Sequence, residues 1–162
     1  MTILSKPPTT TKAPADAKDA IALLKADHGT VSDLFADYEK TNSSNKKKAL
    51  VAEICSELTV HTQIEEEIFY PAIRTALKDK LLVPEATVEH GGIKDLIAQL
   101  EGVEPDGAIY DAKVKVLSEY VEHHVKEEHT EMFPKVKASS LDLVELGARM
   151  ATRKADLLAA RS

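Results

Sequence analysis

The sequence contains little cysteine, little glycine, no long hydrophobic run and no excess of positive charge. A single cysteine, Cys55, excludes a disulfide framework within the chain and any Cys-x-x-Cys metal site. Six glycines and the lack of two-residue hydrophobic alternation argue against a β-fold. No apolar run is long enough to span a membrane. The formal net charge of −6 at pH 7 argues against recognition of nucleic acid by a basic surface.

The N-terminal residues lack a recognisable targeting signal. The segment from Met1 to Leu4 is too short for the apolar core of a signal peptide, and a Thr- and Pro-rich stretch follows it. We therefore expect a cytoplasmic protein. Residues 1–15 hold three prolines and a TTT run, so we expect a disordered tail there and one folded domain over residues 16–162.

The remaining sequence predicts an all-α fold, because long segments rich in Ala, Leu, Lys and Glu lie between a few Pro- and Gly-containing breaks. Four long helices with short connections predict an up-down-up-down four-helix bundle, and a fifth C-terminal helix is expected to pack on it. The predicted helices cover residues 16–40 with Asp16 as N-cap, 45–79 with a kink at Pro71, 84–101 with Pro84 in the first turn, 107–137 with a kink at Pro134, and 140–160.

The sequence also repeats itself. HGTVSDLFADYE from His28 and HGGIKDLIAQLE from His90 agree at six of twelve positions. HTQIEEEIFYP from His61 and HVKEEHTEMFP from His124 share the histidine, a glutamate four residues later and a proline ten residues later. The chain therefore resembles one helical hairpin written twice, and two hairpins facing each other with pseudo-two-fold symmetry are the natural packing.

Each of the four bundle helices carries a histidine within its apolar stripe, and two carry a glutamate one turn later. The stripes step by three and four residues, which is the spacing of a left-handed bundle seam. The stripes are Ile21, Leu24, His28, Val31, Phe35 and Tyr38; Ile54, Leu58, His61, Glu65, Ile68 and Ala72; Val83, Ala86, His90, Ile93, Ile97 and Leu100; and Tyr110, Val114, Leu117, Val121, His124, Glu128 and Met132. Helix lengths allow the polar residues to share one layer.

Two interpretations of this polar core compete. A lone core histidine is usually a hydrogen-bonded structural residue, but here four histidines and two carboxylates would be buried together. An unpaired buried carboxylate costs several kcal/mol, and ion pairs would still leave two imidazoles in need of partners. A bound cation satisfies all six groups, so we favour a metal site. The predicted ligands are His28, His61, Glu65, His90, His124 and Glu128.

The donor set also restricts the metal. Six ligands exceed the four that zinc takes, and calcium and magnesium prefer oxygen alone. Mixed nitrogen and oxygen donors suit one or two six-coordinate iron or manganese ions, and two ions would share the glutamates.

The constellation of His28, His61-x₃-Glu65, His90 and His124-x₃-Glu128 resembles the hemerythrin-like, HHE cation-binding domain over about residues 17–137. The resemblance implies two iron ions with an oxo or hydroxo bridge, the histidines as terminal ligands and the glutamates as bridges; manganese is the less favoured metal. Oxygen-carrying members have a second histidine where this chain has Lys94, and an aspartate five residues after the last helix's histidine, where this chain has Glu128 four after. These departures favour reaction with O2, peroxide or nitric oxide over reversible oxygen carriage.

Three functions follow as hypotheses. The first is a di-iron protein that binds or turns over small oxidants in a stress response. The second is an iron or oxygen sensor or an iron store without turnover, and the third is a metal-free helical module for protein contacts. Beside the predicted ligands, Tyr120 is either a hydrogen-bond donor to the site or, as we favour, a residue on the flank of the bundle. Glu66 or Glu127 is expected to hydrogen-bond a ligand imidazole.

Overall fold

The computed structural model describes residues 19–161, which contain helices and no strand. The predicted N-terminal tail therefore lies outside the described residues. The helical elements, in chain order, are α1 (Ala20–Lys40), α2 (Ser44–Ile64), the π-helix η1 (Glu65–Phe69), α3 (Tyr70–Ala76), α4 (Leu82–Leu100), α5 (Ala108–Glu127), the π-helix η2 (Glu128–Met132), α6 (Phe133–Lys137) and α7 (Leu143–Arg161).

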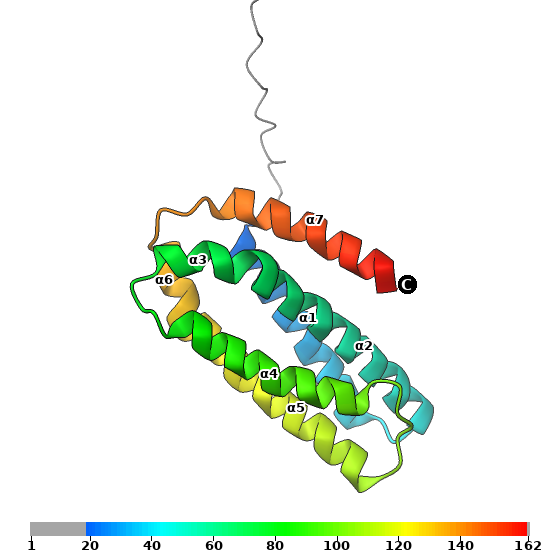
Figure 1. The fold of residues 1–162 in the computed structure, drawn as a ribbon. Coiled ribbons are helices and arrows are strands. Elements are labelled where there is room, and N and C mark those ends of the chain that lie inside the picture. The colour runs from blue at the N-terminus through cyan, green and yellow to red at the C-terminus, as the bar shows by residue number, and fades with distance from the viewer. Residues whose placement is uncertain (1–18, 162) are drawn as a thin grey trace, which may run out of the picture.

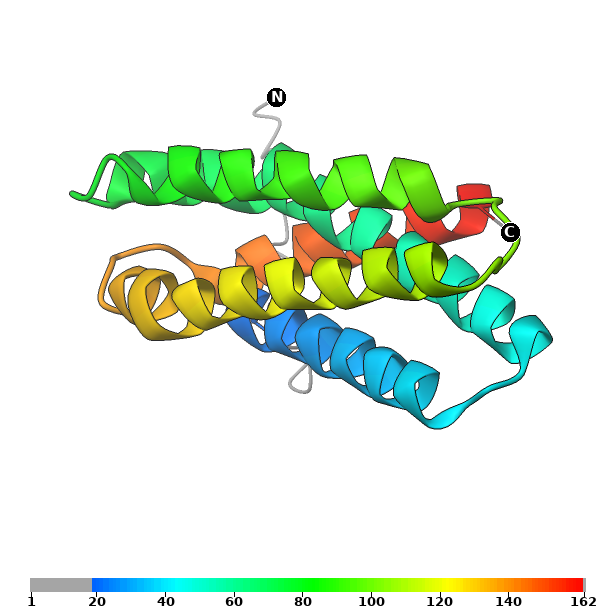
Figure 2. The same cartoon turned by 90° about the horizontal axis from the view of Figure 1, so that it is seen from below.

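The predicted bundle architecture is confirmed. α1 packs against α2, which η1 and α3 continue, and α4 packs against α5, which η2 and α6 continue (Figures 1 and 2). These two hairpins face each other in an up-down-up-down arrangement. The C-terminal helix α7 lies along the first hairpin and contacts α1 and α2 (Figure 1).

Several predicted helix ends were wrong. α1 begins at Ala20 because the carboxylate of Asp19, and not Asp16, caps it by accepting a hydrogen bond from the Ala22 amide at 2.8 Å. Asp16 lies outside the described residues. The second predicted helix ends at Ala76 and not at residue 79, because Leu77 is extended. α7 begins at Leu143 after Asp142, whose carboxylate accepts a hydrogen bond from the Glu145 amide.

A π-helical turn stands before each proline at which we predicted a kink. Pro71 and Pro134 each lie at the second residue of the α-helix that follows the π-turn. A proline ring clashes with the carbonyl four residues before it, and a wider turn relieves that clash. The extra residue shifts the buried stripe, so Phe69 and Ile73 are buried where we predicted Ile68 and Ala72.

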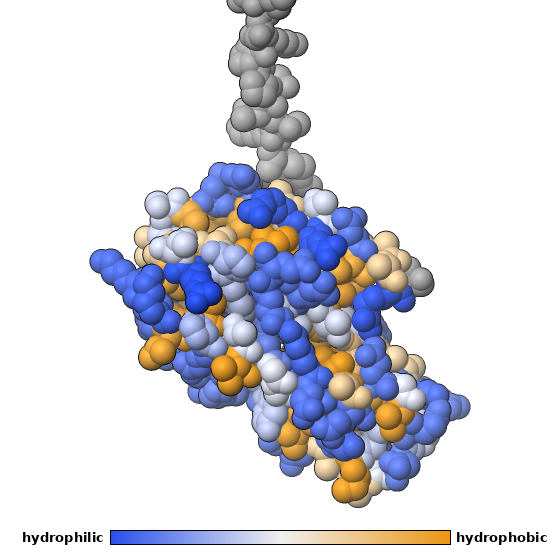
Figure 3. All heavy atoms as spheres, in the orientation of Figure 1, coloured by the Kyte–Doolittle hydropathy of each residue, from blue (hydrophilic) through white to orange (hydrophobic). Residues whose placement is uncertain are grey.

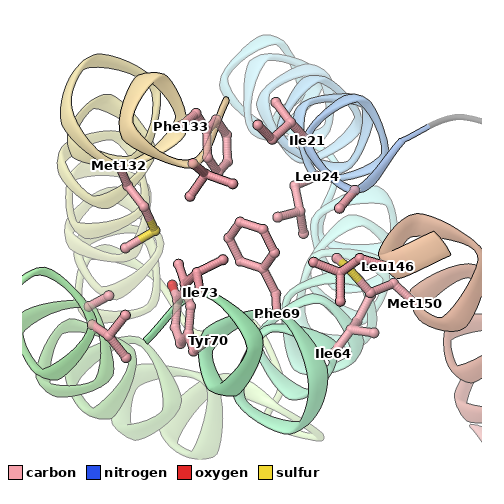
Figure 4. Close-up of a cluster of buried hydrophobic side chains, with 14 of the residues drawn as sticks. Ile21, Leu24, Ile64, Phe69, Tyr70, Ile73, Met132, Phe133, Leu146 and Met150 are labelled. Carbon is pink, nitrogen blue, oxygen red and sulfur yellow. The ribbon is translucent and has the colours of Figure 1, made fainter. Parts of the chain in front are cut away.

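Two apolar clusters fill the bundle, one on each side of the level of the four histidines. The first surrounds Phe69, Tyr70 and Phe133 and includes Leu146 and Met150 of α7 (Figure 4). The second is aliphatic apart from two tyrosines and one cysteine, and lies toward the α1–α2 and α4–α5 connections. Hydrophilic residues cover much of the face shown in Figure 3, with hydrophobic residues scattered among them. None of the described helices is long and apolar enough to cross a membrane.

Candidate metal centre

The six predicted ligands come together in a single layer between the two apolar clusters. α1 and α4 each supply one histidine, whereas α2 with η1 and α5 with η2 each supply a histidine and a glutamate. All six side chains are buried, and Glu65 and His90 have no exposed surface. The residues are His28, His61, Glu65, His90, His124 and Glu128.

The Nε2 atoms of the four histidines point toward the two carboxylates. Nε2 of His28 lies 3.2 Å from Nε2 of His61, and the same atoms of His90 and His124 are 3.0 Å apart. Glu65 Oε1 lies 3.1 Å from His61 Nε2 and 3.3 Å from His90 Nε2. Glu128 Oε1 lies 3.1 Å from His124 Nε2 and 3.4 Å from His28 Nε2. Each carboxylate therefore contacts one histidine from each hairpin.

These separations suit ligands of a shared cation better than a hydrogen-bonded core. Two ligands at right angles, each about 2.1 Å from a metal, are about 3 Å apart. Both carboxylate oxygens of Glu65 and Oε1 of Glu128 are buried without a hydrogen-bond partner, although imidazole nitrogens lie within 3.4 Å of the two Oε1 atoms. Such unsatisfied buried oxygens require an explanation, and a metal ion would supply one.

The donors form two groups of three, each drawn from both hairpins. One group is His28 and His61 with Glu128, and the other is His90 and His124 with Glu65. Within each group the ligand atoms lie within 4.8 Å of one another. Each group therefore has the donor atoms that a metal ion could bind.

Acidic residues hold the outer nitrogens of two of the histidines. His61 Nδ1 lies 2.9 Å from Asp27 Oδ2, and His124 Nδ1 lies 2.9 Å from Glu89 Oε1. In each hairpin, the residue just before one histidine thus supports the histidine of the neighbouring helix. A histidine that donates its Nδ1 proton to a carboxylate presents a lone pair at Nε2, as a metal ligand must.

The other two histidines face residues of the opposite hairpin. His28 Nδ1 lies 2.8 Å from Nε2 of His129 in η2. Oε2 of Glu66 in η1 lies 3.7 Å from His90 Nδ1, which is too far for a hydrogen bond and leaves this nitrogen without a hydrogen-bond partner among the described residues. His129 and Glu66 each follow the glutamate of their π-turn, so the pseudo-two-fold symmetry extends to the outer contacts. The prediction that Glu66 or Glu127 hydrogen-bonds a ligand imidazole was wrong, because Glu66 lies too far from His90 and the Glu127 carboxylate contacts the exposed His123 instead.

The two carboxylates make the centre attract positive charge. Burial alone would lower the pKa of His61, but Glu65 and Asp27 outweigh it and raise that pKa to about 10. Burial likewise opposes protonation of His124, and the carboxylates of Glu128 and Glu65 raise its pKa to about 11. Burial would raise the pKa of Glu65, yet His61 and its other partners hold it well below the usual range. Protons or metal cations can balance this negative charge.

One tyrosine at the centre, Tyr70, was not predicted from the sequence. The Tyr70 hydroxyl lies 3.2 Å from His90 Nε2 and 3.3 Å from His124 Nε2, and it donates to Glu128 Oε2 at 3.5 Å. Burial and the nearby carboxylates raise its pKa well above 10, so it keeps its proton. Tyr120, in contrast, is 48% exposed and its ring lies over Gly92, which agrees with a place on the flank of the bundle.

The C-terminal helix also reaches the ligand sphere. Lys154 of α7 donates a hydrogen bond to Asp27 Oδ1, while Asp27 Oδ2 contacts His61. Burial would raise the pKa of Asp27, but His61 and Lys154 together lower it. The counterpart of Asp27, Glu89, contacts the exposed His123 at 3.1 Å instead of a lysine. The two halves of the centre therefore differ in their outer charge.

Comparison with known proteins identifies the family. The profile of the hemerythrin HHE cation binding domain matches residues 19–136, a range that contains all six clustered side chains. This chain belongs to the hemerythrin HHE cation-binding family. Family membership and the two His/Glu groups together support metal binding by this hemerythrin-family chain.

The individual relatives share between 26% and 28% of their residues with this chain. A crystal structure titled as a hemerythrin HHE cation binding domain-containing protein, the Rv2633c homolog from Mycobacterium kansasii, has a TM-score of 0.74 and 28% identity, and the match covers 88% of this chain and 89% of that one. The uncharacterized protein Rv2633c of Mycobacterium tuberculosis is 28% identical over 139 residues, 83% of this chain and 84% of that protein. A DNA nickase of Nostoc sp. is 26% identical over 115 residues, 71% of this chain but 32% of the nickase. The match thus spans about a third of that relative.

Proposed function

We propose that this chain binds two iron ions and that the pair reacts with small oxidants. His28 and His61 would hold one ion, His90 and His124 the other, and Glu65 and Glu128 would bridge them. The observation that carries the proposal is that Oε1 of each glutamate lies within 3.4 Å of one imidazole nitrogen from each hairpin. Manganese is the less favoured alternative, because nitrogen and oxygen donors suit both metals and the family resemblance favours iron.

A bound iron pair supplies redox chemistry toward O2, hydrogen peroxide or nitric oxide. The chain supplies two histidines and two shared carboxylates per ion, which leaves about two of six coordination positions for other ligands. The aromatic and aliphatic clusters exclude bulk water from the layer. Tyr70 offers a proton donor beside Glu128, within the same layer.

The biological role proposed is defence against oxidative or nitrosative stress in the cytoplasm, with a small molecule as the ligand and neither nucleic acid nor membrane as partner. The replacement of a further histidine by Lys94 supports reaction over reversible carriage. We further propose that residues 16–162 act as one domain and that residues 1–15 form a disordered tail.

Iron-loaded protein should test the proposal directly. We expect about two irons per chain by elemental analysis, an absorption band that changes with peroxide or nitric oxide, and sustained consumption of hydrogen peroxide. His61→Ala and Glu65→Ala should lose iron and reactivity together. His123→Ala is a matched control, because this histidine is 65% exposed and contacts Glu89 and Glu127 at the surface. Iron binding without consumption would instead support a sensor or an iron store.

A further inference from the structure

A small internal cavity adjoins the histidine layer. Its volume is about 10 Å³, roughly the space for one water-sized molecule. Its lining combines three of the clustered histidines, His28, His61 and His124, with aliphatic side chains that include Val31 and Val121.

Aromatic rings pack against two of the clustered histidines. Phe133 stacks on His28 with ring centroids 6.1 Å apart and an interplanar angle of 7°. The Tyr70 ring lies 5.3 Å from that of His90. An added ligand therefore finds space on the aliphatic side, away from Phe133 and Tyr70.

A surface groove between α1 and α5 leads toward this cavity. The groove has a volume of about 480 Å³, and its walls include Ser32 of α1 and Lys126 of α5. The two helices lie side by side in Figure 2. His28, Val121 and Val125 line both the groove and the cavity, so these three side chains are the partition between them. His28 is also the most exposed of the four clustered histidines, at 8%.

We infer that small ligands reach the metal centre through the α1–α5 groove and that Val121 and Val125 form the gate. This inference rests on the proposed function and specifies the ligand further. Two aliphatic side chains one helical turn apart admit an uncharged molecule of about two heavy atoms, because an ion would lose its hydration between them. Nitric oxide, O2 and hydrogen peroxide meet that description.

The pseudo-two-fold symmetry places a second groove on the opposite side of the bundle, but an ion pair closes this second route to the cavity. An equivalent groove of about 470 Å³ lies between α2 and α4, where Thr62 also lines the cavity. There Lys94 and Glu66 form an ion pair of 2.6 Å that joins α4 to η1. The residue equivalent to Lys94 on the open side is Ser32, whose side chain is short. His90, the counterpart of His28, has no exposed surface.

The rate of nitric oxide binding to reduced, iron-loaded protein tests the gate, and stopped-flow absorbance measures it. Val125→Ala removes two methyl groups from the partition and should accelerate binding several-fold. Val125→Phe should slow binding by about tenfold, since an overpacked partition opens less often. Iron content and helical circular dichroism report whether each variant is intact. If Val125→Phe fails to fold, Val125→Ala still tests the inference.

Two further variants complete the experiment. Val60→Ala makes the same truncation beside the ligand His61, but Val60 belongs to the opposite cluster and should leave the rate unchanged. Lys94→Ala breaks the ion pair that closes the groove between α2 and α4, so it should open a second route and restore fast binding to the Val125→Phe protein. Equal rates in wild type and both Val125 variants would overturn the gate, whatever the rate of Lys94→Ala.

Xenon separates failure of the gate from failure of the proposed function. If the wild type binds no nitric oxide, the proposed function fails. Crystals of iron-loaded Val125→Ala under xenon pressure should still hold xenon beside Val31 and Val121, since enlarged apolar cavities bind this gas. A cavity without xenon would overturn the route independently of iron chemistry.

Discussion

Removal of the metal should make the stability of this protein fall steeply as the pH rises above neutral. In the metal-free fold, the pKa of His61 is about 10 and that of His124 about 11, against an ordinary value of 6.5. Because both values are raised, the stabilisation they confer is complete below pH 6.5 and is lost as the pH rises through 10 and 11.

The size of the effect follows from the one proton that each of these histidines binds in the folded state and releases on unfolding. Each raised histidine contributes about 1.4 kcal/mol per pH unit, so both together lose up to about 5 kcal/mol between pH 7 and pH 9. A domain of this size has a total stability of about 5–15 kcal/mol. The metal-free protein should therefore lose at least about a third of its stability between pH 7 and pH 9.

The iron-loaded protein should show the opposite trend. Metal and proton compete for the imidazole nitrogens, so metal affinity increases over the same pH interval and adds to the free energy of unfolding. Urea denaturation of chelator-treated and iron-loaded protein at pH 7, 8 and 9 measures both slopes. Glu65→Gln, which removes the carboxylate 3.1 Å from His61 Nε2, should flatten the metal-free slope. Parallel slopes with and without iron would refute the reasoning.

Three further substitutions test the surroundings of the centre. Asp27→Asn should weaken metal affinity by about 10- to 100-fold, because Asp27 contacts the ligand His61 directly. Lys154→Met should weaken it less, because Lys154 acts on His61 only through Asp27. Competition with a chelator measures the metal affinity of both variants. Tyr70→Phe should keep both irons but shift the absorption band, and an unchanged spectrum would show that the hydroxyl does not affect the metals. Phe133→Ala should lower the free energy of unfolding by about 3–5 kcal/mol, because the ring is almost fully buried, and a loss below about 1 kcal/mol by urea denaturation would contradict this packing.

The positions of the clustered side chains could be predicted because the histidines lie on α-helices and each glutamate is the first residue of the π-turn that follows. Steps of three and four residues place His28, His61, His90 and His124 on the inner faces, and Glu65 and Glu128 each follow a histidine by one turn. The all-α bundle and its two repeated hairpins followed from the same spacing. The role of the four histidines and two glutamates as metal ligands stays a prediction.

The other residues around the centre could not be predicted, because their positions depend on the π-turns and on contacts between helices. Tyr70 was missed because α-helical steps were continued past Glu65, whereas the π-turn adds a residue and rotates Tyr70 inward. Asp27 and Glu89 were missed because each supports a histidine on another helix. An available signal was the acidic residue that precedes His28 and His90 in both repeats.

Iron-edge anomalous diffraction from crystals of iron-loaded protein tests the central claim most directly. The account predicts two peaks between Glu65 and Glu128, each within about 2.2 Å of the Nε2 atoms of the two histidines of one hairpin. A single peak, or peaks only at the surface group of Glu89, His123 and Glu127, would contradict it.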